Sequence, residues 1–125
     1  MALTISHTTK SYTALPYSKM AESILGKKYQ LSLVFIGEKR AQKLNLSSRG
    51  KNYTPNILSF PLDKSNGEIF ICESKSASEA KNFNLSKKAY VGFLFIHGCL
   101  HLKGFAHGDK MEKKEKFYLK KFGLK

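Results

Sequence analysis

The chain has little cysteine, few acidic residues and no long apolar run. Two cysteines, Cys72 and Cys99, among 125 residues are too few for a disulfide framework, so we expect a protein of a reducing compartment. No apolar stretch approaches the ~20 residues of a membrane span, and the first residues lack the basic start and apolar block of a signal peptide. These absences argue against a disulfide-stapled or membrane protein and predict a cytoplasmic one.

The remaining composition is that of one ordinary globular domain. Hydrophobic residues make up 42% of the chain and charged residues 25%, values that exclude an intrinsically disordered protein. A chain of this length buries enough surface to fold without a disulfide or a structural metal. We therefore expect residues 1–125 to form a single domain.

Acidic side chains are scarce relative to basic ones. Nine Asp and Glu stand against 22 Lys and Arg, which gives a formal net charge of +13. Such a charge attracts polyanions, and a nucleic acid is the obvious partner. All but two of the basic residues are lysines, so a general lysine bias is an alternative explanation. The charge favours contact with nucleic acid but does not indicate any chemistry.

Apolar periodicity and turn residues predict helices and strands along most of the chain. Pro61 should end one strand, and Asn66-Gly67 should supply the turn before the next. Strands are expected at residues 30–37, 56–61 and 67–72. Helices are expected at residues 17–25, 38–46, 76–83, 86–103 and 109–122.

The helix from Ser86 to Gly104 is apolar on nearly every side, so we expect it to be the central buried helix. A serine should cap the helix before it, and Asp109 should cap the helix after it. The order of helices and strands predicts a small α+β domain, with a sheet on one side and helices covering it.

Three of the four histidines lie within the eleven residues HGCLHLKGFAH. His97 and His101 are four residues apart, so on a helix they share one face, as imidazoles that bind one metal do. Gly104 lets the chain turn back, so His107 can supply a third ligand. Three protein ligands leave one position open, which is typical of a catalytic metal site. The alternative, three ordinary hydrogen-bonded histidines, explains this spacing poorly.

The neighbours of these histidines limit the chemistry. Cys99 lies about 200° around the helix from His97, so its thiol is expected in the core rather than on the metal. Gly98 occupies the position of the general-base glutamate in the H-E-x-x-H metalloprotease motif, which disfavours proteolysis by that route. The general base is therefore unassigned, and Asp109 is better explained as a helix cap.

Arg49 is one of only two arginines, and the sequence predicts that it lies in a Ser-Ser-Arg-Gly-Lys loop before a strand. A guanidinium can hold a phosphate bidentately, which a lysine cannot do. Arg49 is thus a candidate electrostatic clamp on a scissile phosphate. A solvated loop arginine is the alternative. Tyr53, shortly after it, is a candidate to stack on a base, although packing is the commoner role of such a residue.

Three segments, HGCLHLKGFAH, LNLSSRGKNYTPNILSFP and NGEIFIC, together resemble the bacterial YbeY family of single-domain endoribonucleases, also called rRNA maturation factors. The family patterns are H-G-x-L-H-L-x-G-[YF]-D-H, L-N-x-x-Y-R-G-x-D-x-P-T-[DN]-V-L-S-F-P and G-D-I-x-I-C. The segments occur here in the family's order and with similar separations, and the resemblance spans residues 44–109.

The resemblance implies a zinc-dependent endoribonuclease specific for single strands, built as an α+β sandwich with a small mixed sheet. Its role would be maturation of rRNA, notably the 3′ end of small-subunit rRNA, and ribosome quality control. One Zn²⁺ per chain would be held by His97, His101 and His107. Arg49 would be the catalytic residue that contacts RNA phosphate.

The partners implied are single-stranded RNA, rRNA, and the small ribosomal subunit with its associated factors. Neither DNA nor a membrane is expected as a partner. Lys51, in the loop of Arg49, and Lys103, beside the histidines, are expected to lead the RNA backbone toward the site.

The sequence departs from the family patterns without losing a metal ligand or the arginine. The loss of an aspartate at Ala106 removes a side chain that could orient one of the ligands. The other departures are Ser48 for tyrosine, Asn52 for aspartate, Thr54-Pro55 for Pro-Thr, and Glu68 for aspartate.

Two other functions remain open at this point. The protein could be a non-catalytic ribosome-assembly or RNA-binding factor with a mainly structural metal, a reading motivated by the unassigned general base. It could also hydrolyse a substrate other than RNA, which the histidines allow but the positive charge does not favour.

Overall fold

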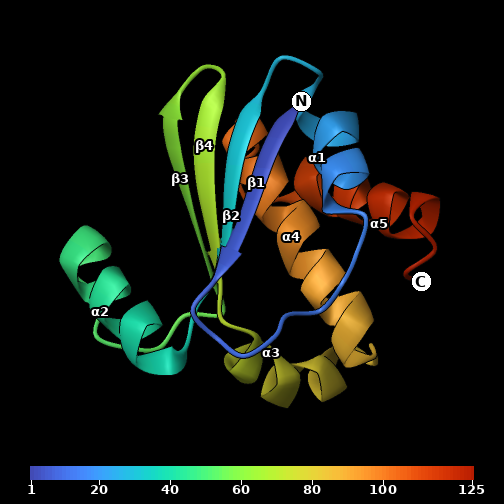
Figure 1. Ribbon diagram of the computed structural model, residues 1–125. Helices are drawn as coiled ribbons and strands as arrows, with labels where there is room; N and C mark the ends of the chain where they lie inside the picture. The colour runs from blue at the N-terminus through green and yellow to red at the C-terminus, as the bar shows by residue number, and fades with distance from the viewer.

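One long helix, α4 (Lys87–Lys103), lies against a four-stranded sheet in the computed structural model, which describes residues 1–125 (Figure 1). The Ser86 side chain caps its start by accepting a hydrogen bond from the Ala89 N–H, and Gly104 ends it in the left-handed conformation. Ten of its 17 residues are buried, which explains its lack of a polar face. The prediction of a central buried helix is confirmed.

The sheet is mixed, as expected. Three parallel strands, β1 (Ala2–His7), β2 (Gln30–Phe35) and β4 (Asn66–Ile71), are followed by an antiparallel edge strand, β3 (Ile57–Asp63), in the order β1-β2-β4-β3. Alternate residues of the two central strands are buried, because successive side chains of a strand point to opposite faces. The domain is therefore α+β with one apolar sheet face turned toward the helices.

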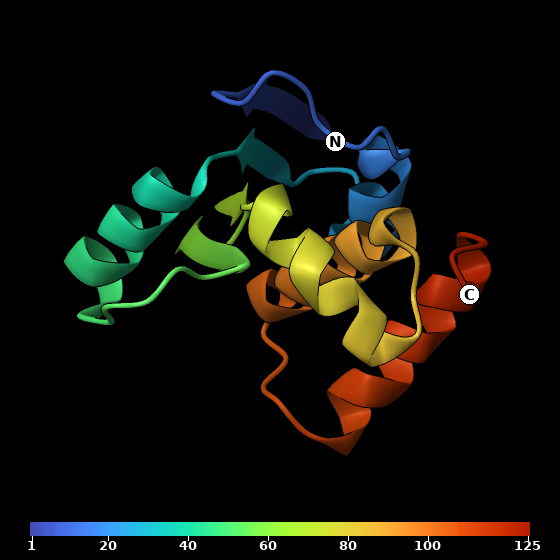
Figure 2. The same ribbon diagram turned by 90° about the horizontal axis from the view of Figure 1, so that it is seen from below.

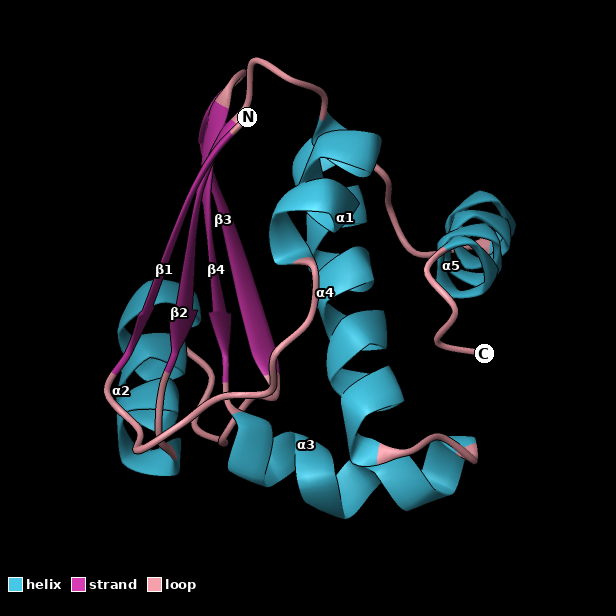
Figure 3. Cartoon of the chain, turned by 45° about the vertical axis from the view of Figure 1, so that its right-hand side comes forward, coloured by secondary structure: helices cyan, strands magenta, loops and turns pink.

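Most of the helices form a layer on one side of the sheet, and two others lie near its lower end, one on the opposite side and one below it (Figure 3). In the layer, α1 (Tyr17–Leu25) packs on α4, and α5 (Asp109–Lys121) packs on the outer side of α4. Near the lower end, α2 (Glu38–Arg49) lies on the side of the sheet away from α4, and α3 (Glu73–Glu79) lies below the sheet and continues into a short 3₁₀ helix, η1 (Ala80–Phe83). No helix has both the length and the apolar character needed to cross a membrane.

Helix α4 approaches β3 unusually closely at Gly98. A Cβ atom at this position would lie 2.8 Å from Ile57 Cδ1 and 2.8 Å from Ser59 Oγ. Glycine therefore lets the helix lie this close to the edge strand without displacing those two side chains. The same close approach holds the part of α4 that carries His97 against the sheet.

Five predictions about strands and helix starts were wrong, three of them about strands. Strand β1 was not predicted, because its side chains are mostly exposed and its apolar alternation is limited to Leu3 and Ile5. Strand β3 passes through Pro61, which an edge strand tolerates because one side of its backbone has no partner. The turn before β4 falls at Lys64 and Ser65, and Asn66 already belongs to that strand, its amide donating to Asp63.

The other two concern helix starts. Helix α3 begins at Glu73 rather than at a capping serine three residues later, and Cys72 occupies its N-cap position without a side-chain bond. Gly108, not Asp109, occupies the N-cap position of α5, so Asp109 is the first helical residue and caps nothing. Its carboxylate instead lies in the first turn, where it suits the positive end of the helix dipole.

Candidate metal centre

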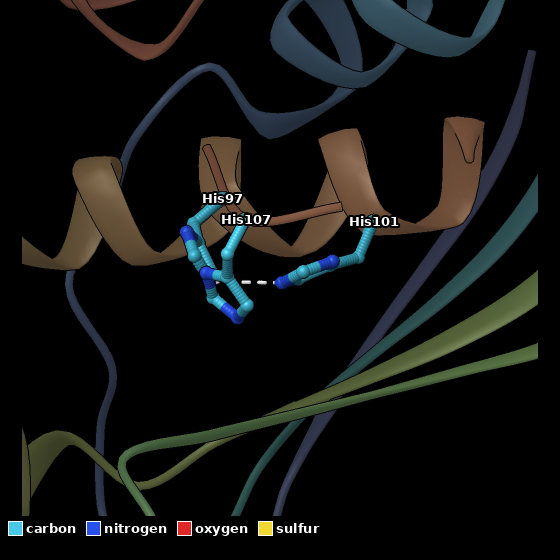
Figure 4. Close-up of side chains that lie close together, drawn as sticks. All are labelled: His97, His101 and His107. Atoms are coloured by element: carbon cyan, nitrogen blue, oxygen red, sulfur yellow. Dashed lines mark hydrogen bonds between the residues drawn. The ribbon is translucent and has the colours of Figure 1, made fainter. Parts of the chain in front are cut away.

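The three histidines of the motif converge on one point (Figure 4). His97 and His101 come from successive turns of α4, and His107 comes from the loop that follows Gly104. Each offers one ligand nitrogen, and these nitrogens all lie within 4.8 Å of one another. The predicted convergence of the three side chains is confirmed, and the left-handed Gly104 provides the predicted reversal.

Two of the imidazoles are oriented by hydrogen bonds from their outer nitrogen. His97 Nδ1 lies 2.6 Å from Glu115 Oε2, and His101 Nδ1 lies 3.0 Å from the Phe105 carbonyl oxygen. Because Nδ1 donates in each case, Nε2 of the neutral ring carries the lone pair and faces the centre. Such outer partners fix the tautomer and direction of histidine ligands in metalloproteins.

The inner nitrogens fit a shared cation. His97 Nε2 and His101 Nε2 are 3.0 Å apart. Two acceptor lone pairs at this distance repel each other unless a proton or a metal ion lies between them. Two nitrogens that bind one tetrahedral ion at ~2.0–2.1 Å stand about 3.3 Å apart. The donor set can therefore hold a divalent metal without rearrangement of the helix.

The environment of His101 also suits a metal ligand. Burial, followed by the neighbouring His97, lowers the pKa of His101, and a lowered pKa favours the neutral imidazole that binds metal. Cys99, in contrast, is fully buried in the core, where burial raises the pKa of its thiol. Cys99 is not one of the grouped ligands, as the sequence predicted.

The histidines open into a cavity of about 790 Å³. Its opposite wall is formed by the end of α2, the segment that leads into β3, and helix α3. Besides the three histidines, the lining residues are Glu38, Arg49, Tyr53, Thr54, Pro55, Asn56, Ile57, Leu58, Ser59, Lys75 and Glu79. The arginine segment and the histidine segment, 48 residues apart, thus face the same space.

Arg49 lies on the last turn of α2 rather than in the predicted loop, because the helix continues to Gly50. Its side chain is exposed, and Nη1 donates to Asn45 Oδ1 at 3.4 Å. Asn45 is fully buried, and its amide nitrogen donates to the Tyr53 carbonyl at 3.0 Å. One buried asparagine therefore links the arginine to the chain segment on which Tyr53 is displayed.

The two lysines singled out from the sequence do not line this cavity. Lys51 and Lys103 are both exposed, Lys51 after α2 and Lys103 at the end of α4. Lys75, on α3, lines the cavity instead. It was missed because α3 was expected to begin at residue 76.

Sequence reasoning also missed Glu115. It is almost fully buried on α5, 18 residues from the histidine whose Nδ1 it accepts. The signal was present in the sequence, since Met111, Glu115 and Leu119 recur every four residues on the buried face of α5. A glutamate in an apolar stripe requires a partner, and His97 is that partner.

Comparisons with known proteins agree with this geometry. The sequence pattern of the family described as endoribonuclease YbeY matches residues 4–124. The chain is similar to endoribonuclease YbeY of Alkaliphilus metalliredigens, at 34% identity over 112 residues, covering 77% of this chain and 72% of the relative. It is similar to that of Polynucleobacter asymbioticus at 37% over 124 residues, covering 85% and 80%.

A solved structure agrees as well. The chain resembles the solution structure of a Thermotoga maritima protein, with a TM-score of 0.71 at 25% identity over 96% of this chain and 88% of that one.

Proposed function

Because this chain belongs to the endoribonuclease YbeY family, whose members cleave RNA, we propose that it cuts single-stranded RNA with one zinc ion held by His97, His101 and His107. The observation that carries the proposal is the convergence of three imidazole nitrogens within 4.8 Å, at the wall of a cavity that Arg49 also lines. Residues 1–125 form a single hydrolase domain in this proposal. The metal, when bound, supplies Lewis acidity toward a phosphate oxygen and acidifies a water molecule.

The protein side chains have separate tasks in this proposal. Glu115 and the Phe105 carbonyl hold His97 and His101 with their Nε2 atoms toward the metal position. The Arg49 guanidinium, across the cavity, binds the phosphate of the bond to be cut and stabilises its developing charge. Lys75 adds positive charge on the same wall, and the half-exposed Tyr53 ring offers a stacking surface for a base.

The carboxylates that line the cavity, Glu38 and Glu79, are the candidates for the general base. Glu79 accepts a hydrogen bond from the Asn56 amide, and Glu38 accepts one from Ser74. Asp109 is exposed and does not line the cavity, so it is not a candidate for this task.

We propose rRNA as the natural substrate and the cytoplasm as the place of action. The specific task is maturation of the small-subunit rRNA 3′ end, together with ribosome quality control, in contact with the small subunit and its factors. The net charge of +13 supports a large polyanionic partner of this kind. Lys51 and Lys103, outside the cavity, remain predicted contacts for the RNA backbone.

The test uses labelled single-stranded rRNA and the purified protein. We expect cleavage that is lost on chelation, returns with zinc and falls strongly in Arg49→Ala. The matched control is Arg40→Ala, which removes the other arginine, an exposed residue of the same helix that does not line the cavity. Equal cleavage by all samples would indicate a contaminating nuclease and contradict the proposal. RNA binding without cleavage under any metal would favour a non-catalytic assembly factor.

A further inference from the structure

A second cavity, of about 530 Å³, lies between η1, α4 at Phe93, and α5, and we call it the α4–α5 pocket. Seen from below in Figure 2, the end of the α3–η1 segment overlaps α5 in projection, and residues of both line the pocket. One wall is aromatic, formed by Phe83 and Phe93, and the opposite wall is lined by Leu119 and lysines of α5. None of its lining residues lines the cavity of the metal centre.

The aromatic wall leads to the metal centre. The Phe83 ring is 49% exposed although it stacks on Tyr90, with ring centroids 5.1 Å apart and an interplanar angle of 26°. Phe93 lies 6.1 Å from Phe83 on one side and 6.1 Å from His97 on the other. A series of ring faces thus runs from the surface to a proposed metal ligand. Such faces stack on nucleobases with little regard to sequence.

The charges of the pocket complement a nucleic-acid backbone. Lys116, Lys120 and Lys125 line it and are exposed. Two carboxylates also line it, but Glu115 is engaged by His97, which leaves Glu112 as the one free acid. An apolar floor with a mainly basic rim is the combination that binds single-stranded nucleic acid.

The distance from the metal centre fits a nucleotide close to the cleaved bond. Successive phosphates of one strand in duplex DNA are ~3.4 Å apart along the helix axis, and an extended single strand spaces them more widely. The 6.1 Å between the rings of Phe93 and His97 therefore corresponds to one or two nucleotides. A strand whose phosphate lies at the histidines has a base within reach of the pocket.

We propose that the α4–α5 pocket is a nucleobase-binding subsite, in which a base one or two nucleotides from the cut enters against Phe83 and Phe93. Lys116 and Lys120 bind the adjoining phosphate. The inference rests on the proposed nuclease function and adds a physical reason for single-strand specificity. A base enters the pocket only when it has left its helical stack, so paired RNA is excluded.

The first test is binding of a labelled single-stranded RNA oligonucleotide by fluorescence anisotropy, with metal removed so that no cleavage occurs. We expect Phe83→Ala to weaken binding at least fivefold, because loss of one base–aromatic stack is worth about 1–3 kcal/mol. Phe83→Trp, which keeps an aromatic ring at this position, should bind the RNA about as tightly as the wild-type protein. The matched control is Phe117→Ala, since Phe117 is 56% exposed on α5 and lies outside the pocket. Circular dichroism of each variant checks that Phe83→Ala still folds.

The second test asks whether a nucleobase contacts Phe83 and whether Lys116 and Lys120 contact phosphate. An oligonucleotide with one abasic position next to the cut should bind the wild-type protein more weakly than the intact oligonucleotide does. Phe83→Ala should bind the two oligonucleotides equally, since the missing base and the missing ring remove the same contact. Lys116→Gln with Lys120→Gln should lower the slope of log affinity against log salt by about one per lost phosphate contact. Lys114→Gln, on the same helix but outside the pocket, is the control for charge.

The outcomes separate this inference from the function on which it rests. Unchanged RNA affinity and cleavage in folded Phe83→Ala would overturn the subsite while leaving the nuclease intact. Wild type that binds RNA through Phe83 but never cleaves it would retain the subsite and overturn the nuclease. If Phe83→Ala loses binding to a small-subunit protein and keeps its RNA affinity, the pocket is a protein-docking site and the inference is wrong.

Discussion

The two walls of the metal cavity are held in place in different ways. On the histidine wall, His97 and His101 are each oriented through Nδ1, at 2.6 Å from the Glu115 carboxylate and 3.0 Å from a backbone carbonyl. On the arginine wall, the exposed Arg49 has one hydrogen bond of 3.4 Å, to Asn45. In the proposed function, the hydrogen-bonded histidines present Nε2 to the metal in a fixed direction, whereas the exposed arginine can adjust to its substrate. The cavity thus combines a fixed half and an adjustable half.

The largest effect on metal binding and cleavage is expected when one of the three histidines of the fixed wall is removed. His101→Ala removes one of three ligands and should abolish both metal retention and chelator-sensitive cleavage, because two imidazoles do not hold the ion at working concentrations. Metal content by mass spectrometry and a cleavage assay measure the two effects. His7→Ala, at an exposed histidine of β1, should change neither. Full metal content in His101→Ala would contradict the three-histidine site.

The next effect tests the adjustable half. Arg49→Lys keeps the charge but loses the bidentate geometry, so we expect cleavage to slow by about 10²-fold, the scale of losing one donor to a developing oxyanion. Metal affinity should not change, because Arg49 contacts no histidine in the structure. Single-turnover cleavage and a metal titration separate the two quantities. Arg40→Lys is the control. If Arg49→Lys cleaves as fast as the wild-type protein, Arg49 contributes only its positive charge and not its bidentate geometry.

A smaller effect is expected outside the ligand set itself. Glu115→Ala leaves His97 without its partner and should weaken metal binding by about 10- to 100-fold, measured by competition with a chromogenic chelator. Glu115→Gln should retain most of the affinity, since its amide oxygen still accepts from Nδ1–H. Glu112→Ala, one turn away and exposed, controls for loss of negative charge. Equal affinity in Glu115→Ala would show that His97 needs no orienting partner.

The smallest effect concerns the link between the arginine and Tyr53. Asn45→Ala removes the hydrogen bonds to Arg49 and to the Tyr53 carbonyl, and we expect a loss of about 1–3 kcal/mol in the free energy of unfolding. Cleavage should fall only a few-fold, because Arg49 retains its charge and mobility. Urea denaturation and kcat/KM report the two effects. Gln42→Ala, an exposed neighbour on α2, is the control. If Asn45→Ala lowers the cleavage rate as much as Arg49→Ala does, the arginine wall is also held in a fixed position.

The features predicted correctly from sequence are those encoded within a few neighbouring residues. The four-residue spacing of His97 and His101, the turn at Gly104 and the cap at Ser86 are properties of one helix and its ends. They could be predicted because helical geometry alone places such residues. The mixed sheet followed from the family resemblance rather than from any single strand.

The features that sequence reasoning missed depend on contacts between distant segments. The role of Glu115 arises only when α5 packs on α4, and Lys75 joins the cavity only because α3 begins at Glu73. Strand β1 has too few apolar residues to be recognised and exists because β2 offers a parallel partner. Arg49 was recognised, but its position at a helix end was not, because polar residues gave α2 little apolar periodicity.

The close approach of α4 to β3 at Gly98 bears on the evolutionary options of the chain. The same position in an H-E-x-x-H helix carries the glutamate that activates water. Here, a Cβ atom would come within 2.8 Å of the ends of the Ile57 and Ser59 side chains on the edge strand, so a glutamate fits only if both side chains turn away or the helix lifts from the sheet. A descendant that gained peptidase chemistry by this route would therefore have to repack β3 as well as replace Gly98.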